Sequence, residues 1–410
     1  MKVASVIAEF NPLHKGHEYL LREAKSRTGA DALIIIMSGN FVQRGTPAFM
    51  SEALRTEAAL LSGADLVLEL PLCYATSSID DFASGAVFSL ADTGIVDTLV
   101  FGCENDDLAL MQRAAALKED AFFHERLLAE LATGVTYPAA YAKTILANVS
   151  APEREALTPY FSSPNNLLGL FYLRANDCLE EPFTVQLIKR EGAAYHDAEM
   201  DAGAYASATA LRASLCSDTP EEAFFQMPEA VRARMQEEFH KTYPIEANDL
   251  SGMLFEKLTH MSYDKLISYA GVTNDLARRI LDRRDHLIDF ESFIVECKTK
   301  QITQVAVQRA LLHILLDVDE IPENPPYLRV LGLRGALGKE LLASLCKNAA
   351  IPVVTSLTEA EKTFAETQNY QALRLLEKEI RADDRYRYLI RNRYRTQTKN
   401  AYQRGLIILN

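Results

Sequence analysis

The sequence contains little cysteine and no tryptophan. Six cysteines are spread over 410 residues, and no two of them form a C-x-x-C pair. Scattered cysteines supply neither a ligand set for zinc nor a disulfide framework, so the pattern argues against a small secreted scaffold. We expect all six to be buried or incidental thiols.

Long hydrophobic runs are also absent. No stretch approaches the roughly 20 apolar residues that span a bilayer, and the first residues lack the basic and then apolar layout of a signal peptide. We therefore expect a cytoplasmic protein with no membrane partner. With 48% hydrophobic residues, the chain is long enough to bury more than one core, and we expect two or three domains.

Positive charge is in deficit, with 43 Lys and Arg against 56 Asp and Glu. This balance does not favour a nucleic-acid partner, because phosphates are neutralised by local positive charge. Residues 371–410 are the exception, since they carry ten basic and four acidic side chains with tyrosines between them. Such a segment suits backbone contacts combined with base stacking, and the alternative is a solvated helix face with inward-packing tyrosines. A second basic run, at residues 278–300, would extend the same face.

The most informative stretch is at the N-terminus. Apolar residues between 3 and 10 predict a buried strand, Asn11-Pro12 ends it, and helical spacing follows at residues 19–24. Between them stands His14-Lys15-Gly16-His17. Two imidazoles and an ammonium at a helix N-terminus, beside a glycine that admits phosphate, suit the charge of a developing pyrophosphate. The alternatives are surface histidines on a first helical turn and a metal pair.

Strand and helix signals alternate through the first half of the chain. The predicted strands are Lys2–Phe10, Ala32–Met37, Ala64–Glu69, Asp97–Phe101 and Phe183–Ile188. Alternation of this kind predicts a parallel sheet with ligands at the carboxyl ends of its strands. Polar, glycine or basic residues follow four of these strands, at 11–17, 38–40, 102–104 and 189–190. One shared cleft is therefore expected.

The pattern changes after residue 219. Long helical patterns run to Asp317, and the proline-rich break at 322–326 stops them. Short strands at Leu328–Leu331 and Ile351–Thr355 then flank a helix at Leu337–Lys347, before the basic terminal helix. The expected organisation is an α/β Rossmann-like domain at 1–219, a helical domain at 220–320, and a small α/β unit with the basic helix at 321–410.

Two motifs resemble those of the nucleotidyltransferase superfamily that carries the HIGH-type motif. The first is the histidine segment above, and the second is Ser207-Ala208-Thr209-Ala210-Leu211-Arg212, which departs from the commoner double-serine form at Ala208. Longer segments resemble the bacterial tRNA(Met) cytidine acetate ligase family over nearly the whole chain. They are AEFNPLHKGHEYL, SGNFVQRGTPAFMSEALRTEAALLSGADLVLELP, FGCEN, SSPNNLLGLFYLRA and IKREGAAYHD.

The resemblance implies a reaction and its partners. ATP would activate acetate as acetyl-adenylate, with Mg²⁺ accompanying the nucleotide. The acetyl group would then pass to the exocyclic amine of the wobble cytidine of elongator tRNA(Met), giving acetylcytidine. No DNA partner is implied, and no carboxylate cage for the metal is visible in the sequence.

The resemblance also implies site residues. His14, His17 and Lys15 would be catalytic. ATP would be lined by Ile7, Ala8, Glu9, Phe10, Asn11, Pro12, Leu13, His14, Lys15, Gly16, His17, Glu18, Tyr19, Leu20, Gly102, Asn165, Arg190, Ser207, Thr209 and Arg212. RNA would contact Arg385, Arg387, Arg391, Arg393 and Arg395.

Some of these residues have simpler interpretations. Gly102 fits a strand-end turn, Asn165 fits a helix N-cap after a proline, and Arg190 fits a surface position. Residues 43–45 and Arg55 are polar enough to meet the acyl substrate or the RNA, and the sequence favours neither.

Two other functions remain open at this stage. One is a small-molecule adenylyltransferase, for which the second half of the chain would need another role such as oligomerisation. The other is a non-catalytic RNA-binding protein on the same fold. The sequence defines neither the acyl chain length nor the oligomeric state, and the tRNA follows from the resemblance alone.

Overall fold

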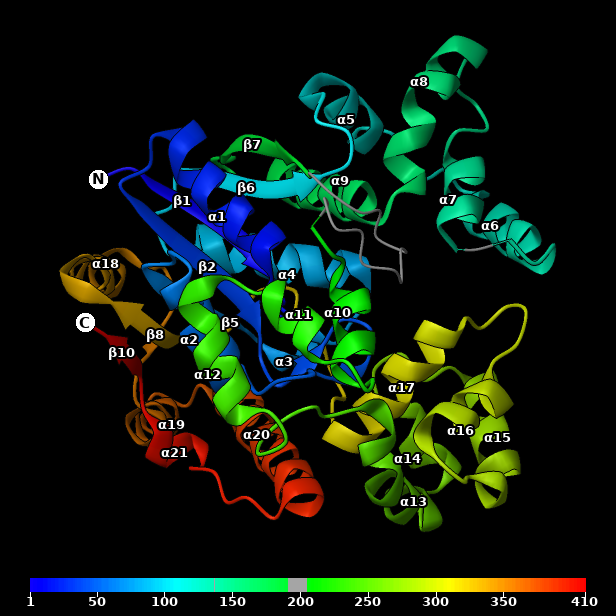
Figure 1. Cartoon of the computed structure of the whole chain (residues 1–410). Helices are drawn as coiled ribbons and strands as arrows, with labels where there is room; N and C mark the ends of the chain where they lie inside the picture. Colours follow the sequence, from blue (N-terminus) through cyan, green and yellow to red (C-terminus); the bar gives the residue numbers. More distant parts are fainter. Residues whose placement is uncertain (136, 191–204) are drawn as a thin grey trace.

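One sheet of eight strands organises the described part of the chain (Figure 1). The computed structural model describes residues 1–135, 137–190 and 205–410. Five parallel strands lie in the order β5-β2-β1-β6-β7. They are β1 (Val3–Ala8), β2 (Ala32–Ser38), β5 (Leu66–Leu70), β6 (Thr98–Cys103) and β7 (Thr184–Lys189). The α/β parallel-sheet class and all five N-terminal strands are confirmed.

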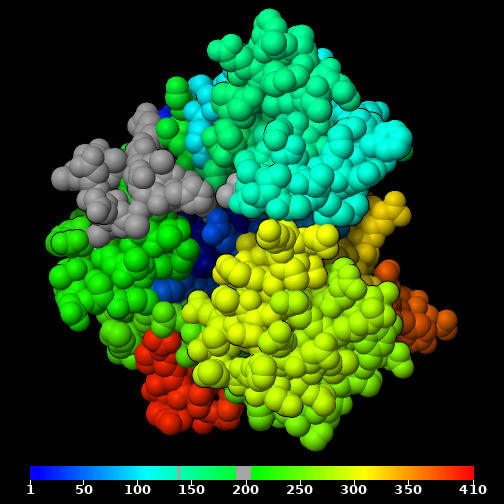
Figure 2. All heavy atoms as spheres, turned by 90° about the vertical axis from the view of Figure 1, so that its right-hand side faces the viewer, coloured from blue at the N-terminus to red at the C-terminus, as the bar shows by residue number. Residues whose placement is uncertain are grey.

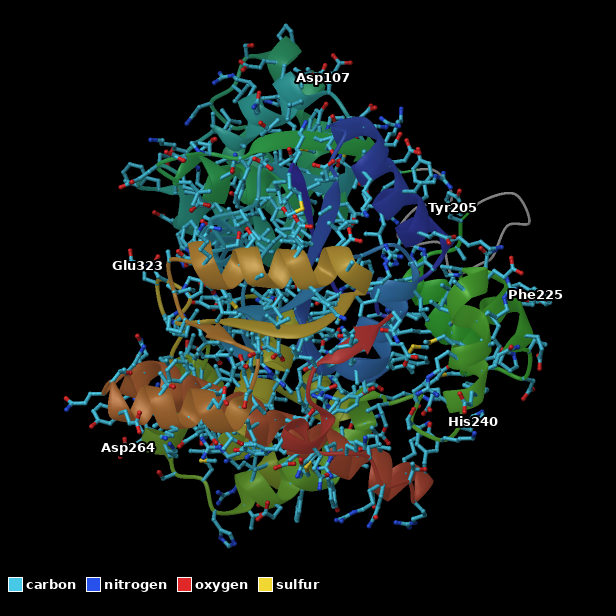
Figure 3. All side chains as sticks on the ribbon, turned by 90° about the vertical axis from the view of Figure 1, so that its left-hand side faces the viewer. Asp107, Tyr205, Phe225, His240, Asp264 and Glu323 are labelled. Carbon is cyan, nitrogen blue, oxygen red and sulfur yellow. The ribbon has the colours of Figure 1, made fainter. Side chains whose placement is uncertain are left out.

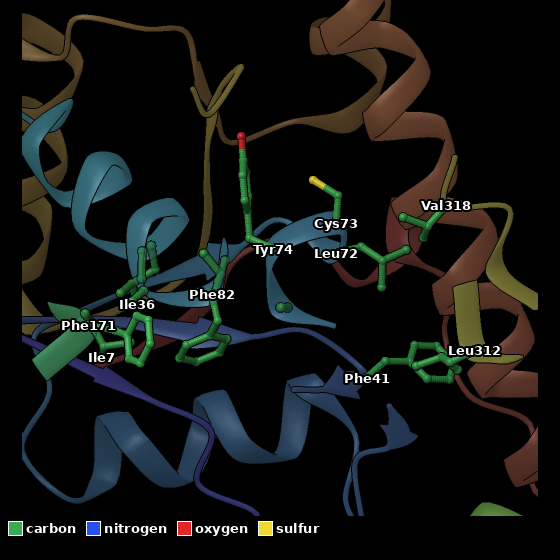
Figure 4. Packing of buried hydrophobic residues seen from close by; sticks show 14 of the residues in the cluster. Ile7, Ile36, Phe41, Leu72, Cys73, Tyr74, Phe82, Phe171, Leu312 and Val318 are labelled. Atoms are coloured by element: carbon green, nitrogen blue, oxygen red, sulfur yellow. The ribbon is translucent and has the colours of Figure 1, made fainter. Parts of the chain in front are cut away.

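Both faces of the sheet are covered by helices. Because successive side chains of a strand point to opposite faces, Ile7 of β1 packs on one side and Val6 on the other. The first face carries α4 (Ile79–Ala91) and α9 (Pro164–Asp177), and Figure 4 shows Ile7 and Ile36 near Phe82 and Phe171. The second face carries α1 (Lys15–Thr28) and α2 (Glu52–Leu61). The result is a three-layer sandwich.

The C-terminal strands continue this sheet. β8 (Leu328–Arg334) pairs antiparallel with β5, and β9 (Val353–Val354) and β10 (Ile407–Leu409) pair parallel with β8. The helix between β8 and β9 is α18 (Gly335–Asn348), and α19 (Leu357–Glu366) follows. The predicted strands and helix are present, but they share the core of the N-terminal domain rather than forming a core of their own. The domain boundaries at 219 and 320 stay a prediction.

Two groups of helices extend from the sandwich (Figure 1). The first, between β6 and α9, consists of α5 (Leu108–Ala115), α6 (Phe123–Ala132), α7 (Tyr137–Ile145) and α8 (Ala151–Ser162). Three helices follow β7: α10 (Ala208–Leu215), α11 (Glu221–Phe225) and α12 (Glu229–Glu238). The second group comes after them and consists of α13 (Ser251–Thr259), α14 (Tyr263–Ile267), α15 (Asn274–Arg283), α16 (Phe290–Cys297) and α17 (Gln304–Leu316). The helical region predicted for residues 220–317 is confirmed. No described helix combines the length and apolarity that a membrane crossing requires.

A short hairpin joins the sheet to the second helical group. Its strands are β3 (Phe41–Val42) and β4 (Thr46–Pro47), which pair antiparallel after the end of β2. Phe41 and Leu312 of α17 lie in the same buried cluster, as Figure 4 shows. Gly45 at the hairpin turn has φ +79°, and a Cβ there would lie 2.6 Å from the backbone nitrogen of Arg309. Only glycine therefore fits this turn.

Charged side chains cross the core between β5, β8 and the long helix α20 (Tyr370–Tyr394). Arg329 lies 2.5 Å from Glu69 and 3.8 Å from Glu379. Arg404 of α21 (Ala401–Arg404) lies 3.0 Å from both Glu52 and Asp383. The basic terminal helix predicted from the sequence is thus anchored to the sheet by buried ion pairs.

Candidate active site

The histidine motif forms the N-terminus of α1, directly after β1. His14 is the N-cap, and its Nδ1 accepts the backbone N–H of Gly16 at 3.1 Å. The Nδ1 of His17 accepts the backbone N–H of His14 at 3.3 Å. The two imidazoles thereby form a capping box, a role usually taken by Ser or Thr with Glu or Gln.

This pairing fixes the proton on each neutral ring. Because both Nδ1 atoms accept from the backbone, the N–H of each imidazole is at Nε2. Burial, with a contribution from the Arg190 charge, lowers the pKa of His14 to about 3. Burial and the nearby His14 and Arg190 place the pKa of His17 well below its usual value. Both rings are neutral hydrogen-bond donors near pH 7.

The rings are held in place from several sides. They stack on each other with centroids 3.8 Å apart, and Phe10 packs edge-on against His17 at 5.1 Å. Phe10 has φ 47°, in the left-handed region, which costs of order 1–3 kcal/mol for a non-glycine residue. A Cβ at Gly16 would lie 2.9 Å from Cε1 of His14. A side chain at Gly16 would therefore push this ring out of its position.

Residues distant in the sequence also contact the start of α1. Lys15 donates its backbone N–H to the carbonyl of Gln226 at 2.9 Å. Tyr205 lies beside Tyr19 with ring centroids 5.9 Å apart, and Figure 3 shows it next to α1. No sequence signal singled out Tyr205.

The neighbouring strand ends contribute Gly102 and Arg190. The backbone N–H of Arg190 donates to Cys103 at 2.8 Å, and a Cβ at Gly102 would lie 3.5 Å from Cγ of Arg190. The guanidinium is close enough to lower the pKa of both histidines. Strands β1, β6 and β7 therefore bring these residues together, as the parallel-sheet prediction requires.

Glu104, directly after β6, is hydrogen-bonded to the first turn of α9 beside this end of the sheet. Nδ2 of Asn165 donates to Glu104 at 2.6 Å, and the buried Asn166 accepts the backbone N–H of Glu104 at 2.9 Å. Ser163, not Asn165, is the N-cap of α9. The segments FGCEN and SSPNNLLGLFYLRA both stood out in the sequence. Only the fold shows that Asn166 joins them.

The second motif meets the first. Ser207 caps α10 by accepting the backbone N–H of Ala210 at 3.1 Å. Arg212 donates to the carbonyl of Asn11 at 2.7 Å and to the hydroxyl of Thr209 at 3.2 Å. Two segments that lie 201 residues apart in the sequence are thus joined by one guanidinium at residues 9–14, between β1 and α1, which we call the phosphate loop.

Arg55 does not serve either role considered from the sequence. Its side chain is 1% exposed and donates to the backbone carbonyls of Met50, Glu9, Ser38 and Gly39. It fastens the ends of β1 and β2 to α2 and is not accessible to an acyl group or RNA. Glu9, in turn, accepts the backbone N–H of Gln43 at 2.8 Å and so ties the hairpin to the phosphate loop.

The remaining residues expected around ATP fall into two groups. Ile7, Phe10, Pro12, Leu13 and Tyr19 are buried, so they shape the loop from beneath. Ala8, Glu9, Asn11, Lys15, Gly16, His17, Glu18 and Leu20 keep part of their surface exposed. The part of IKREGAAYHD at 191–197 lies outside the described residues.

The arginines expected to contact RNA are partly neutralised within the protein. Arg385 pairs with Asp317 at 2.8 Å and Arg387 with Asp384 at 2.7 Å. Arg393 pairs with both Glu246 and Asp249. Arg391 and Arg395 are exposed, and Arg391 lies over the ring of Tyr388.

Two of the tyrosines proposed for stacking face inward. Tyr386 is fully buried and donates to the carbonyl of Ala48 at 2.8 Å, and Tyr394 donates to Pro244 at 2.6 Å. The inward-packing alternative therefore applies to these two, while Tyr388 is 45% exposed.

Comparison with known proteins shows the family and the fold of the chain. A family model described as HIGH Nucleotidyl Transferase matches residues 1–401. A tRNA(Met) cytidine acetate ligase from Halothermothrix orenii is 32% identical over 397 residues and covers 93% of both chains. The same enzyme from Acetivibrio thermocellus is 33% identical over the full length of both. The crystal structure of apo Thermotoga maritima TmcAL covers both chains fully with a TM-score of 0.89 and 28% identity, and a second form bound with alpha-thio ATP gives 0.87 and 27%.

The fold and the histidine pair are those of a HIGH-motif nucleotidyl transferase. Within that class, the chain belongs to the tRNA(Met) cytidine acetate ligase family. It is accordingly an ATP-dependent ligase.

Proposed function

We propose that this ligase activates acetate with ATP as acetyl-adenylate and transfers the acetyl group to the wobble cytidine of elongator tRNA(Met). The product is acetylcytidine, with AMP and pyrophosphate released. The observation that carries the proposal is the stacked, neutral pair His14 and His17 at the start of α1, in which the backbone contacts within the described residues use Nδ1 and not Nε2.

The chemistry requires activation of the carboxylate. Acetate is a poor acyl donor because its negative charge deactivates the carbonyl and it has no leaving group. If an acetate oxygen attacks the α-phosphorus of ATP in line, the bond to pyrophosphate breaks and acetyl-adenylate forms. The cytidine amine then attacks the acetyl carbonyl, loses a proton, and displaces AMP. Neither step needs a protein nucleophile, so the protein acts by positioning and charge stabilisation.

The histidines suit the charge that builds up on the phosphates. Each neutral imidazole offers one Nε2–H, and each such donor contributes roughly 3 kcal/mol when it is directed at developing negative charge. The N-terminus of α1 adds its own positive potential. Lys15 supplies a positive charge at the first position of α1, and Arg190 and Arg212 supply two more near the loop.

Gly102 and Asn165 complete the proposed nucleotide site from β6 and α9. Gly102 leaves room for the nucleotide beside the backbone, and Ser207 with Thr209 presents hydroxyls from α10. Asn165 holds Glu104 at the rim of this site. These roles follow from the motif positions together with the contacts above.

We assign no step to a metal ion. The described residues contain no group of three or more His, Cys, Asp or Glu side chains arranged to hold one. Mg²⁺ commonly binds together with ATP and takes most of its ligands from the phosphates and water.

The target base must leave its stack to reach the adenylate. An amine inside a stacked anticodon loop is inaccessible, so the cytidine would be splayed into the cleft while the rest of the tRNA is held elsewhere. The exposed Arg391 and Tyr388 of α20 and Arg395 at its C-cap remain available for such contacts, together with the paired Arg385, Arg387 and Arg393.

The test is transfer of radiolabelled acetate to unmodified elongator tRNA(Met), with ATP and without acetyl-CoA. His14→Asn is the informative variant, because the Asn oxygen can replace Nδ1 as the N-cap acceptor but does not extend to the position of Nε2. His17→Gln is the second variant, because Gln can complete the capping box without an imidazole. We expect ATP-dependent label with wild type and a loss of about 10²–10³-fold in each variant. A folded, ATP-binding wild type that labels no tRNA would overturn the assignment and favour a small-molecule acceptor.

A further inference from the structure

A basic groove opens between the two helical groups, outside the site described above. It has a volume of about 750 Å³ and is lined by α15, by the loop at 299–302 and by Ala132 at the end of α6. Figure 2 shows the corresponding yellow and teal segments facing each other, beside a hollow whose floor is formed by blue N-terminal residues. Residues assigned to the nucleotide site are absent from its described lining.

The groove is lined by more positive than negative side chains. Its lining includes the basic Arg278, Arg279, Arg283 and Lys300 and the acidic Asp275 and Asp282. A pocket for a small ligand is usually mostly apolar, with a few convergent polar groups. This lining is charged along its length and therefore fits an extended polyanion.

The positive charges are only weakly paired inside the protein. Arg278 lies 4.0 Å from Asp275, and their side chains are 69% and 83% exposed. Arg283 lies 3.5 Å from Glu296, again at the surface. Within residues 1–135, 137–190 and 205–410, Lys300 makes no ion pair. Exposed pairs at these distances contribute little and are readily exchanged for another anion.

Several arginines of α20 are paired more closely than those of the groove. Arg385, Arg387 and Arg393 have carboxylate partners at 2.7–2.8 Å. A cation that is already neutralised by a close internal carboxylate releases fewer counterions when it meets a phosphate. The charges in the groove are therefore more available to a nucleic acid than those of Arg385, Arg387 and Arg393.

We propose that this groove binds the sugar–phosphate backbone of the tRNA substrate and supplies the larger share of the electrostatic binding energy. The inference rests on the proposed function and adds to it a surface on α15 and the 299–302 loop. The basic run at residues 278–300, singled out in the sequence, then has a role distinct from that of α20.

One helix connects this surface to the phosphate loop through the β3–β4 hairpin. α17 begins at Gln304, directly after the groove, and Arg309 on the same helix packs against Gly45 of the hairpin. Five residues of helix span about 8 Å. The hairpin in turn contacts Glu9 through Gln43. RNA held in the groove would therefore lie beside the structures that lead to His14.

The test compares two charge-reversal pairs of equal size. Arg278→Glu with Lys300→Glu alters the groove, whereas Lys339→Glu with Lys347→Glu alters exposed lysines on α18, at the opposite side of the molecule in Figure 1. Binding of elongator tRNA(Met) is measured between 50 and 200 mM salt, and acetate-dependent ATP–pyrophosphate exchange is measured without tRNA. Each lost phosphate contact should reduce the slope of log K against log salt by about 0.7–0.9.

The groove pair should weaken tRNA binding by at least tenfold at low salt, with exchange unchanged and the α18 pair close to wild type. Equal weakening by both pairs, or unchanged affinity and salt slope in the groove pair, would overturn the groove assignment. Failure of the proposed function is a separate result, because wild type would then neither exchange pyrophosphate with acetate nor bind this tRNA. Arg278→Ala with Lys300→Ala should show the same trend with a smaller effect.

Discussion

The proton positions on His14 and His17 follow from the helix cap. Backbone N–H groups occupy both Nδ1 atoms, so the rings cannot use those atoms for proton transfer without breaking the cap. Their low pKa values mean that they act as fixed donors and not as general acids or bases at neutral pH.

This has a consequence for the pH profile. Because the pKa of His14 is lowered to about 3, protonation of this ring becomes significant only far below pH 5. We expect kcat/KM for ATP, which reports groups of the free enzyme, to show no histidine limb between pH 5 and 8. Pyrophosphate exchange with acetate in excess measures it. An acidic limb near pH 6.5 that disappears in His14→Asn would contradict the buried, neutral pair.

Arg55 gives a stability prediction. Arg55→Lys keeps the charge but cannot reach four backbone carbonyls, and hydrogen bonds from a charged donor contribute about 1.5–3 kcal/mol each. We expect the free energy of unfolding in urea to fall by about 3 kcal/mol or more. Arg22→Lys, at a side chain that is 65% exposed, should change it by less than about 0.5 kcal/mol. Similar effects in the two variants would show that Arg55 does not fasten the strand ends.

At the scale of elements, α10 and the phosphate loop are coupled by Arg212. The bond to the Asn11 carbonyl places the start of α10 against the loop that presents the histidines. A change at this contact should therefore affect catalysis more than folding.

Arg212→Lys tests that coupling. Lysine replaces the two-pronged contact by a single point donor, and one lost bond to a charged donor corresponds to roughly tenfold or more in kcat/KM for ATP. Thr209→Val removes only the hydroxyl partner and should cost less than Arg212→Lys. Melting temperatures of both variants should stay near that of wild type. Equal kinetics in the two variants would indicate that the Asn11 contact is dispensable.

Long elements were predictable from the sequence, and very short strands mostly were not. The five N-terminal strands and α20 were predictable, because long apolar or helical periods are local properties. β3, β4 and β10 were not predicted, since strands of two or three residues carry no period of their own; β9, equally short, was found from the apolar run around it. The site residues His14 and His17 were predictable from their spacing in the sequence. The structural roles of Arg55 and Asn166 were not, because their partners are backbone groups brought near by the fold. Tyr386 packs inward through a contact that spans 338 residues.

At the scale of the molecule, the charged cluster in the core links pH to stability. Burial raises the pKa of Glu379 to about 7, against 4.5 for an ordinary glutamate, although Arg329 opposes the shift. Burial likewise raises the pKa of Glu69. The folded protein thus holds protons that the unfolded chain releases, so stability present at low pH is lost as pH rises from about 4.5 through 7.

Glu379→Gln isolates one of these protons. A shift of this size corresponds to about 3 kcal/mol, so the unfolding free energy of wild type relative to the variant should fall by about 3 kcal/mol across that window. Urea unfolding at pH 4.5, 6 and 8 measures the difference. Glu366→Gln, at an exposed position on α19, controls for the loss of one negative charge. A difference that does not vary with pH would refute the buried proton.

The pairing of β5 with β8 can form only late in translation. Glu69 and Arg329 are separated by 260 residues, which a ribosome adds in roughly 13 to 50 s at 5–20 residues per second. Throughout that interval one edge of the apolar strand β5 has no neighbour to pair with, and open edges of this kind recruit other chains. A nascent chain stalled before residue 328 will therefore depend on chaperones to stay soluble, although its entire histidine motif has already emerged.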